Sequence, residues 1–213
     1  MSDSIPGILV LIVLLDFLAL GSSRMRAVIR AAAMQGVLLG VLPLLMHDHI
    51  NLRLALVCVG TVVAKGVVIP MLLLRAIREV TIRREVEPTV GFTTSLLLGA
   101  LGTGLALLFA GSLPLVETPM AGRILPTSLA TAFAGFVLMT TRQKAVMQVV
   151  GYLILENGIF LFGLLLLDAL PFLVEIGVLL DVFVGVFVIS IILHRIQRTF
   201  SAIDTQDLTS LRE

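Results

Sequence analysis

Long apolar runs, repeated along the whole chain, constrain its fold more than any other feature. A bilayer-spanning helix needs about 20 mostly apolar residues, with a range of about 17 to 25. Seven such runs lie at about residues 5–22, 27–46, 52–74, 90–112, 124–141, 145–167 and 172–194. Only 14% of the 213 residues are charged, whereas a typical soluble domain carries about 25%. The sequence therefore excludes a soluble globular protein and predicts an all-α, polytopic membrane protein with about seven transmembrane helices.

Polar residues weaken the fifth of these runs. They are Pro126, Thr127, Ser128, Thr131, Thr140 and Thr141. The first run is also short. An alternative prediction is therefore six spans and one re-entrant segment.

Basic residues follow every second run. They are Arg24, Arg26, Arg30, Arg75, Arg78, Arg83, Arg84, Arg142, Lys144, Arg195 and Arg198. Cytoplasmic loops collect lysine and arginine, so this pattern predicts that the N-terminus lies outside and the C-terminus in the cytoplasm. The other connections contain His47, Asp48, His49, Glu117, Arg123, Asp168 and Glu175.

Charge, cysteine content and motifs exclude several classes of function. The formal net charge of +1 excludes a polycation that binds nucleic acid. Cys58 is the only cysteine, which excludes a disulfide framework and a cysteine metal site. The sequence contains no HExxH, CxxC or glycine-rich phosphate loop. We therefore expect no catalytic residue, metal ion or redox cofactor in this chain.

Ionisable residues inside the apolar runs are the strongest functional signal. Moving one to the bilayer centre costs at least about 2.5–3.5 kcal/mol, so such residues usually face a bundle interior or water and mark proton pathways. Lys65, Glu156 and Asp181 each lie about ten to thirteen residues from a basic residue at the end of the same run. At a rise of about 1.5 Å per residue, all three fall near the bilayer midplane. Asp16 lies nearer the cytoplasmic side, and Glu175 lies at the outer end of the seventh run.

Two acids and one base at the same depth predict a proton path. Burial disfavours the charged form of each group while an opposite charge nearby favours it, so each group can change its protonation state. The alternative is a static pair in which Lys65 neutralises Glu156 or Asp181, an arrangement that is weak evidence for stability. Smaller polar side chains that would link these sites, or would only join helices by hydrogen bonds, are Gln148, Tyr152, Asn157, Ser190 and His194.

Small residues spaced four apart predict faces where helices pack closely. They form three pairs in the second and fourth runs: Gly36 with Gly40, Gly99 with Thr103, and Ala100 with Gly104. Pro43 and Pro70 lie inside the second and third runs. Each removes a backbone hydrogen bond and is expected to kink its helix.

Several segments resemble component E of hydrogenase-4. They are GYLILENG from Gly151 to Gly158, LVEIG from Leu173 to Gly177, Asp181, and the tail residues Asp204, Leu208, Thr209 and Leu211. The resemblance is specific over about residues 145–213 and weaker over the first 144. It implies a non-redox membrane subunit of a group 4 [NiFe]-hydrogenase or formate hydrogenlyase complex, an assembly related to respiratory complex I.

The last three runs also resemble the small three-helix K subunit of complex I. In that subunit the second and third helices each carry a membrane-embedded glutamate used in proton transfer. Asp181, with His194 near the helix end, fits the third helix, although the acid here is aspartate. The acid of the second helix precedes an asparagine by four positions. Matching that asparagine to Asn157 places Leu153 where the acid should be and Glu156 three residues further along, on the same helix face.

The resemblances together imply an organisation and a set of partners. We expect a four-helix region over 1–112, a K-subunit-like three-helix region over 113–199 and a cytoplasmic tail over 200–213. The expected partners are antiporter-like membrane subunits, a membrane subunit like the H subunit of complex I, a hydrogenase-type peripheral arm and the lipid of a bacterial or archaeal plasma membrane. Proton transfer would involve Glu156, Asp181, Lys65, Asp16 and Glu175. The alternatives are an inert scaffold and a subunit of a multi-component cation/proton antiporter.

The alternation of basic loops generates a topology prediction. Cysteines introduced at position 48 or 117 should react with a membrane-impermeant reagent added to intact cells, in a variant that lacks Cys58. Cysteines at positions 83, 144 and 205 should react only after the membrane is opened. Labelling of position 205 from outside would contradict the predicted orientation.

Overall fold

The computed structural model describes residues 4–46, 52–79, 89–112 and 120–165. The regular elements in these ranges are helices. They are α1 (Ser4–Gly21), α2 (Met25–Met46), α3 (Leu52–Val63), the π-helix η1 (Ala64–Val68), α4 (Ile69–Glu79), α5 (Phe92–Ser112), α6 (Ala121–Thr141) and α7 (Ala145–Leu165).

The described residues contain six helices that are long and apolar enough to cross a membrane, because α3, η1 and α4 form one continuous span. The all-α membrane fold predicted from the sequence is therefore confirmed. The seventh predicted run, at 172–194, lies outside the described residues. The proposed division at residue 112 and the tail over 200–213 stay predictions.

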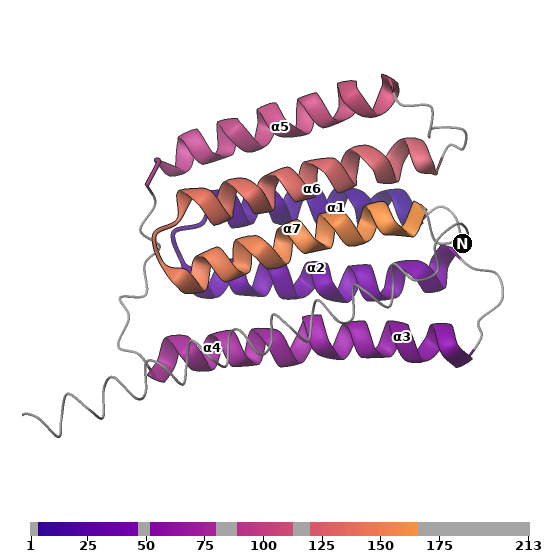
Figure 1. Cartoon of the computed structure of the whole chain (residues 1–213), viewed down its shortest axis with the longest axis horizontal. Helices are drawn as coiled ribbons and strands as arrows, with labels where there is room; N and C mark the ends of the chain where they lie inside the picture. Colours follow the sequence, from indigo (N-terminus) through magenta and orange to yellow (C-terminus); the bar gives the residue numbers. More distant parts are fainter. Residues whose placement is uncertain (1–3, 47–51, 80–88, 113–119, 166–213) are drawn as a thin grey trace, which may run out of the picture.

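Figure 1 shows the helices side by side with nearly parallel axes. Helices α6 and α7 pack along each other, with α1 against α6 and α2 against α7. Helix α5 covers one edge by packing on α6 and α1, and the α3–η1–α4 span covers the opposite edge by packing on α2. The centre of the described bundle is therefore made by α1, α2, α6 and α7.

Most basic residues of the described ranges lie near connections at one end of the bundle. The α1–α2 turn, the end of α4, the start of α5 and the α6–α7 turn lie at the same end (Figure 1). The basic residues near these points are Arg24, Arg26, Arg30, Arg75, Arg142 and Lys144. Such an arrangement is what one cytoplasmic face requires, although the orientation itself stays a prediction.

Helix α6 is a full-length helix despite its polar residues. Its hydroxyl groups donate to carbonyls three or four residues earlier: Thr127 to Arg123, Ser128 to Leu125, and Thr141 to Val137. Pro126 lies near the start of the helix. The fifth predicted run is thus one helix of 21 residues, and the alternative that made it a re-entrant segment is not what the structure shows.

Glycines bring α6 and α7 into backbone contact. A Cβ atom built on Gly151 would lie 2.5 Å from the backbone nitrogen of Met139 and 2.8 Å from its Cα. A Cβ atom on Gly158 would lie 2.7 Å from the Cα of Ala132. No side chain fits between these two backbones, so the closest helix pair in the described bundle depends on glycine.

Some of the small-residue pairs predicted from the sequence form packing faces in the structure, and one does not. Gly40 packs against Val62, and a Cβ on Gly36 would lie 2.5 Å from the Cβ of Lys65, so the α2 pair is confirmed as a packing face. Gly99 packs against Leu20 of α1. The pair of Ala100 and Gly104 is wrong as a packing face within the described bundle, because both residues are exposed.

Gly151→Ala should destabilise the protein, because the new methyl group would overlap backbone atoms of Met139 in α6. Backbone atoms cannot rotate away as a flexible side chain can. Overpacking of this kind costs about 1–3 kcal/mol. Thermal unfolding of the full chain in lipid nanodiscs measures it. Gly104→Ala is the matched control, because a Cβ there has no neighbour within 4 Å and should leave the unfolding temperature unchanged or slightly raised. Equal effects of the two changes would contradict the close packing of α6 on α7.

Candidate functional site

Lys65 lies on the short π-helix in the middle of the third span. The backbone N–H of Ile69 donates to the carbonyl of Ala64, five residues earlier. Pro70 follows directly, and a proline has no N–H and crowds the carbonyl four residues before it. The disturbance expected at Pro70 therefore takes the form of a π turn just before it. Such turns often occur at functional sites.

The ammonium group of Lys65 reaches α7. Its Nζ atom lies 3.1 Å from Oε1 of Glu156, and the two side chains are 5% and 3% exposed. The same Nζ donates to Oδ1 of Asn157 at 3.3 Å and lies 5.5 Å from the centre of the Phe160 ring. The prediction that Lys65 and Glu156 share one depth is confirmed.

Hydrogen bonds continue from Asn157 to α2 and α1. Nδ2 of Asn157 donates to Oε1 of Gln35 at 3.4 Å. Nε2 of Gln35 donates to Oδ1 of Asp16 at 2.7 Å and to the carbonyl of Ile12 at 3.1 Å. The hydroxyl of Thr131, on α6, donates to the other Asp16 oxygen at 2.8 Å.

These contacts make one continuous chain of buried polar side chains, which we call the polar chain. Its members are Thr131, Asp16, Gln35, Asn157, Lys65 and Glu156. None is more than 6% exposed. Hydrogen bonds are stronger in such surroundings, and an unpartnered polar group there is costly. The polar chain therefore ties together α1, α2, η1, α6 and α7 in one defined arrangement.

The polar chain separates two apolar clusters. One cluster contains Leu20, Met25, Leu73 and Met147, towards the basic end of the bundle. The other contains Ile5, Leu39, Leu42, Ile124 and Leu161. On α1, α2, α6 and α7 the polar-chain residue lies between members of the two clusters. The polar layer thus crosses the middle of the described helices.

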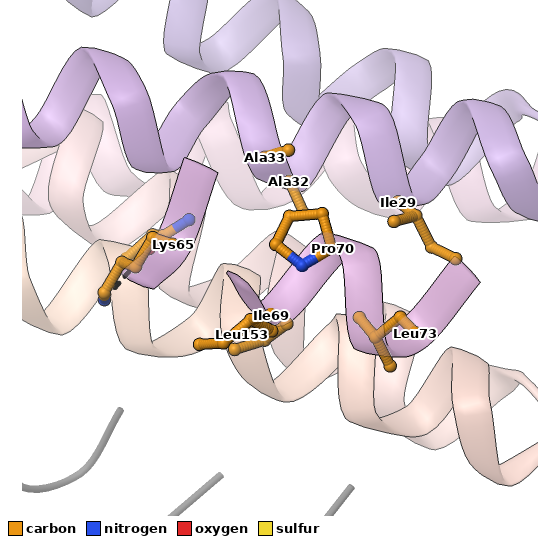
Figure 2. Close-up of a pocket in the computed structure, with 9 residues that line it drawn as sticks. Ile29, Ala32, Ala33, Lys65, Ile69, Pro70, Leu73 and Leu153 are labelled. Carbon is orange, nitrogen blue, oxygen red and sulfur yellow. Dashed lines mark hydrogen bonds between the residues drawn. The ribbon is translucent and has the colours of Figure 1, made fainter. Parts of the chain in front are cut away.

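A small cavity adjoins Lys65 (Figure 2). Its volume is about 10 Å³, close to the lower limit for one water molecule. Lys65, Pro70 and Leu153 line it together with Asn157, and Figure 2 shows Lys65 and Leu153 on neighbouring helices. Leu153 precedes Asn157 by four residues on α7. Leu153 and Glu156 therefore both face Lys65. This agrees with the prediction that these two residues, three apart on α7, lie on the same helix face.

Gln148 and Tyr152 are also predicted for the site, but neither is a member of the polar chain defined above. Gln148 donates to the carbonyl of Arg142 at 3.1 Å, in the α6–α7 turn, and belongs to no part of the polar chain. Tyr152 is half-buried and packs against the cluster nearer the basic end. Residues outside the described ranges are Glu175, Asp181, Ser190 and His194. In the described ranges, no group of three or more His, Cys, Asp or Glu side chains is arranged to hold a metal ion.

Sequence reasoning missed Gln35 and Thr131 as members of the site. Gln35 is the only amide in α2, and a lone amide in an apolar span carries the same signal as an ionisable residue, in weaker form. From the sequence, Thr131 is only one of the polar residues that weaken the fifth run. The sequence predicts Asp16 nearer the cytoplasmic side, and the structure connects it to Lys65 through two hydrogen-bonded amides.

Arg142 is a second buried cation, in the turn after α6. Its Nη2 donates to the carbonyl of Leu20 at 2.6 Å, and its guanidinium lies 5.1 Å from the centre of the Phe92 ring. Burial lowers the pKa of Arg142 from its usual value, but arginine stays protonated in proteins. Arg142 therefore joins the ends of α1, α5 and α6 at the basic end of the bundle.

Lys65→Met should be more destabilising than the double change Lys65→Met/Glu156→Gln. The single change leaves a buried carboxylate without its ammonium partner, which costs about 3–5 kcal/mol, whereas removing both charges is often far less harmful. Thermal unfolding of the full chain in nanodiscs compares them. If the loss of stability in the double variant equals the sum of the losses in the two single variants, the two charges do not interact.

Comparison with known proteins identifies relatives of the chain. No protein-family model and no solved structure matches it significantly. It is 37% identical over 208 residues to the uncharacterized protein Rv0085 of Mycobacterium tuberculosis, and this match covers 95% of this chain and 93% of that protein. It is 30% identical over 154 residues to hydrogenase-4 component E of Escherichia coli K12, and this match covers 70% of this chain and 69% of that protein.

The protein named hydrogenase-4 component E in Shigella flexneri matches to the same extent. These matches cover more than two thirds of both chains and agree with the resemblance seen in the sequence. The chain therefore belongs to the hydrogenase-4 component E family.

Proposed function

We propose that this protein is a non-redox membrane subunit of a complex I-like, group 4 hydrogenase-type complex. It contributes to proton translocation coupled to electron transfer and to assembly of the membrane arm. The relatives named hydrogenase-4 component E support membership of such a complex. The observation that carries the proton-transfer role is the polar chain, in which Lys65 and Glu156 meet in the middle of the helices.

The charged pair is suited to changes of protonation. In this proposal Glu156 binds or releases one proton, and Lys65 loses its favourable partner when Glu156 becomes neutral. Such coupling lets a proton on one group alter the position or affinity of the other. In this proposal Glu156 and Asp181 carry protons and Lys65 is the charge partner. Asp16 and Glu175 are the further residues proposed for proton transfer.

The exposed faces of the bundle suit lipid and neighbouring membrane subunits. Helix α5 presents Leu97, Leu101 and Leu108, which are 59–76% exposed. The opposite edge presents Leu56 and Met71 of the third span. We propose that antiporter-like subunits and an H-subunit-like membrane subunit contact these edges, with the peripheral arm on the cytoplasmic side of the bacterial or archaeal plasma membrane.

A structural scaffold is the second candidate function. The same Lys65–Glu156 contact favours it, because a buried ion pair fixes the register of one helix against another. In this role the charges would never titrate, and only their presence during assembly would matter.

Glu156→Gln in the assembled complex separates the two functions. Glutamine keeps the size and hydrogen bonding of the side chain but cannot release a proton. We expect normal assembly and normal electron transfer to an artificial acceptor. Proton translocation in sealed vesicles should fall about tenfold or more, since a positioned proton carrier typically contributes at least that much.

Gln148→Leu is the matched control on the same helix, because Gln148 lies outside the polar chain. It should leave proton translocation unchanged. Translocation at the wild-type rate by a fully assembled Glu156→Gln complex would favour the scaffold.

A further inference from the structure

A groove lies between α1, α5 and α6, on the side of the bundle away from the third span. Its volume is about 350 Å³. It begins at Pro6 and Arg123, near the starts of α1 and α6, and it reaches Leu14 and Ala130, nearer the middle of these helices. Both starts lie at the end of the bundle opposite the α6–α7 turn (Figure 1). The groove therefore leads from one end of the helices towards the bilayer interior.

The described lining of this groove is mostly apolar. Its walls include Val10, Leu14 and Leu107, which are 57–60% exposed. The hydroxyls of its two threonines, Thr103 and Thr127, each donate to a carbonyl four residues earlier in the same helix, at 2.8 and 2.9 Å. Because these donors are already paired, an occupant need not supply an acceptor for them. The lining therefore favours an aliphatic occupant.

The dimensions of the groove suit one acyl chain. At about 1.5 Å per residue, it runs about 12 Å along α1, from Pro6 to Leu14, and about 10 Å along α6, from Arg123 to Ala130. One leaflet of the hydrocarbon core is about 15 Å thick. A helix of a neighbouring subunit is about 10–12 Å across, too wide to enter between α1, α5 and α6, which pack on one another. A lipid chain is narrow enough and long enough to lie in the groove.

Arg123 places a positive charge where the groove begins. It is exposed and lies in the first turn of α6, at the end of the bundle opposite the main group of basic residues. A guanidinium group binds phosphate oxygens through two parallel hydrogen bonds. The described lining contains no carboxylate to attract the ammonium group of a zwitterionic lipid. The charge of the groove therefore matches the headgroup of an anionic phospholipid.

We propose that this groove binds one anionic phospholipid, with its phosphate at Arg123 and one acyl chain along α1, α5 and α6. The site is separate from the polar chain and does not depend on the proton-transfer role proposed above. The bound lipid fills the space between α5 and the centre of the bundle near these helix ends. It thereby joins α5 to α1 and α6.

A single introduced tryptophan reports on the lipid beside it, because the chain contains no tryptophan. Leu107→Trp places this reporter on the wall of the groove, and Leu108→Trp is the matched control on the exposed face of α5 outside the groove. The full chain is reconstituted in phosphatidylcholine vesicles that contain brominated phosphatidylglycerol, and fluorescence quenching measures the relative binding of the two lipids. Phosphatidylglycerol should be favoured about fivefold at position 107 and should show no preference at position 108.

Arg123→Gln, added to the Leu107→Trp chain, tests the headgroup contact. It should abolish the preference for phosphatidylglycerol at position 107. Arg26→Gln is the matched control, because it removes one exposed arginine at the opposite end of the bundle, and it should leave the preference unchanged. Equal lipid preference at positions 107 and 108, or a preference that survives Arg123→Gln, would overturn the proposal.

Native mass spectrometry of the full chain covers the case in which a tryptophan at position 107 itself blocks the groove. The wild-type chain, released from vesicles of both lipids, should retain one phosphatidylglycerol molecule. Arg123→Gln should lose it, and so should Val10→Trp, whose ring should fill the groove. Equal retention by the wild type and both variants would overturn the proposal. In the assembled complex, absence of quenching at position 107 would show that a neighbouring subunit occupies the groove instead, and would also overturn it.

Discussion

The contact between Lys65 and Glu156 is the interaction on which the described bundle most depends. For Nζ of Lys65 to lie 3.1 Å from the Glu156 carboxylate, the third span must lie close to both α2 and α7. Gly36 permits this approach, because any larger side chain would meet the Cβ of Lys65. Gln35, the residue before Gly36, is thereby brought to Asn157. Helix packing and the polar chain are therefore parts of one arrangement.

A polar layer between two apolar clusters has physical consequences for motion and function. The clusters hold the helices by packing, whereas the layer between them holds them by directed hydrogen bonds whose strength depends on charge. A change of protonation at Glu156 or Asp16 acts on this layer first. The π turn that carries Lys65 is a local departure from α-helical geometry next to that charge, and such places are where a helix adjusts most readily.

Part of the site is predictable from sequence and part is not. Counting residues from basic helix ends gives depth, so it correctly placed Lys65 and Glu156 at the same depth. It does not give the direction in which a side chain points around the helix, so Gln35 and Thr131 were not identified as partners of Asp16. The same limit explains the glycines: Gly36 and Gly40 were found by spacing, whereas Gly151 and Gly158 are seven apart. The π turn at Lys65 depends on tertiary packing as well as on Pro70.

We expect the polar chain to work as a unit, and changing a residue of the chain that cannot titrate tests this most directly. The measurement is the number of protons translocated per electron pair by the assembled complex with Gln35→Leu. We predict normal assembly and electron transfer with most of the translocation lost, although every ionisable residue is retained. A wild-type proton ratio in that variant would contradict it.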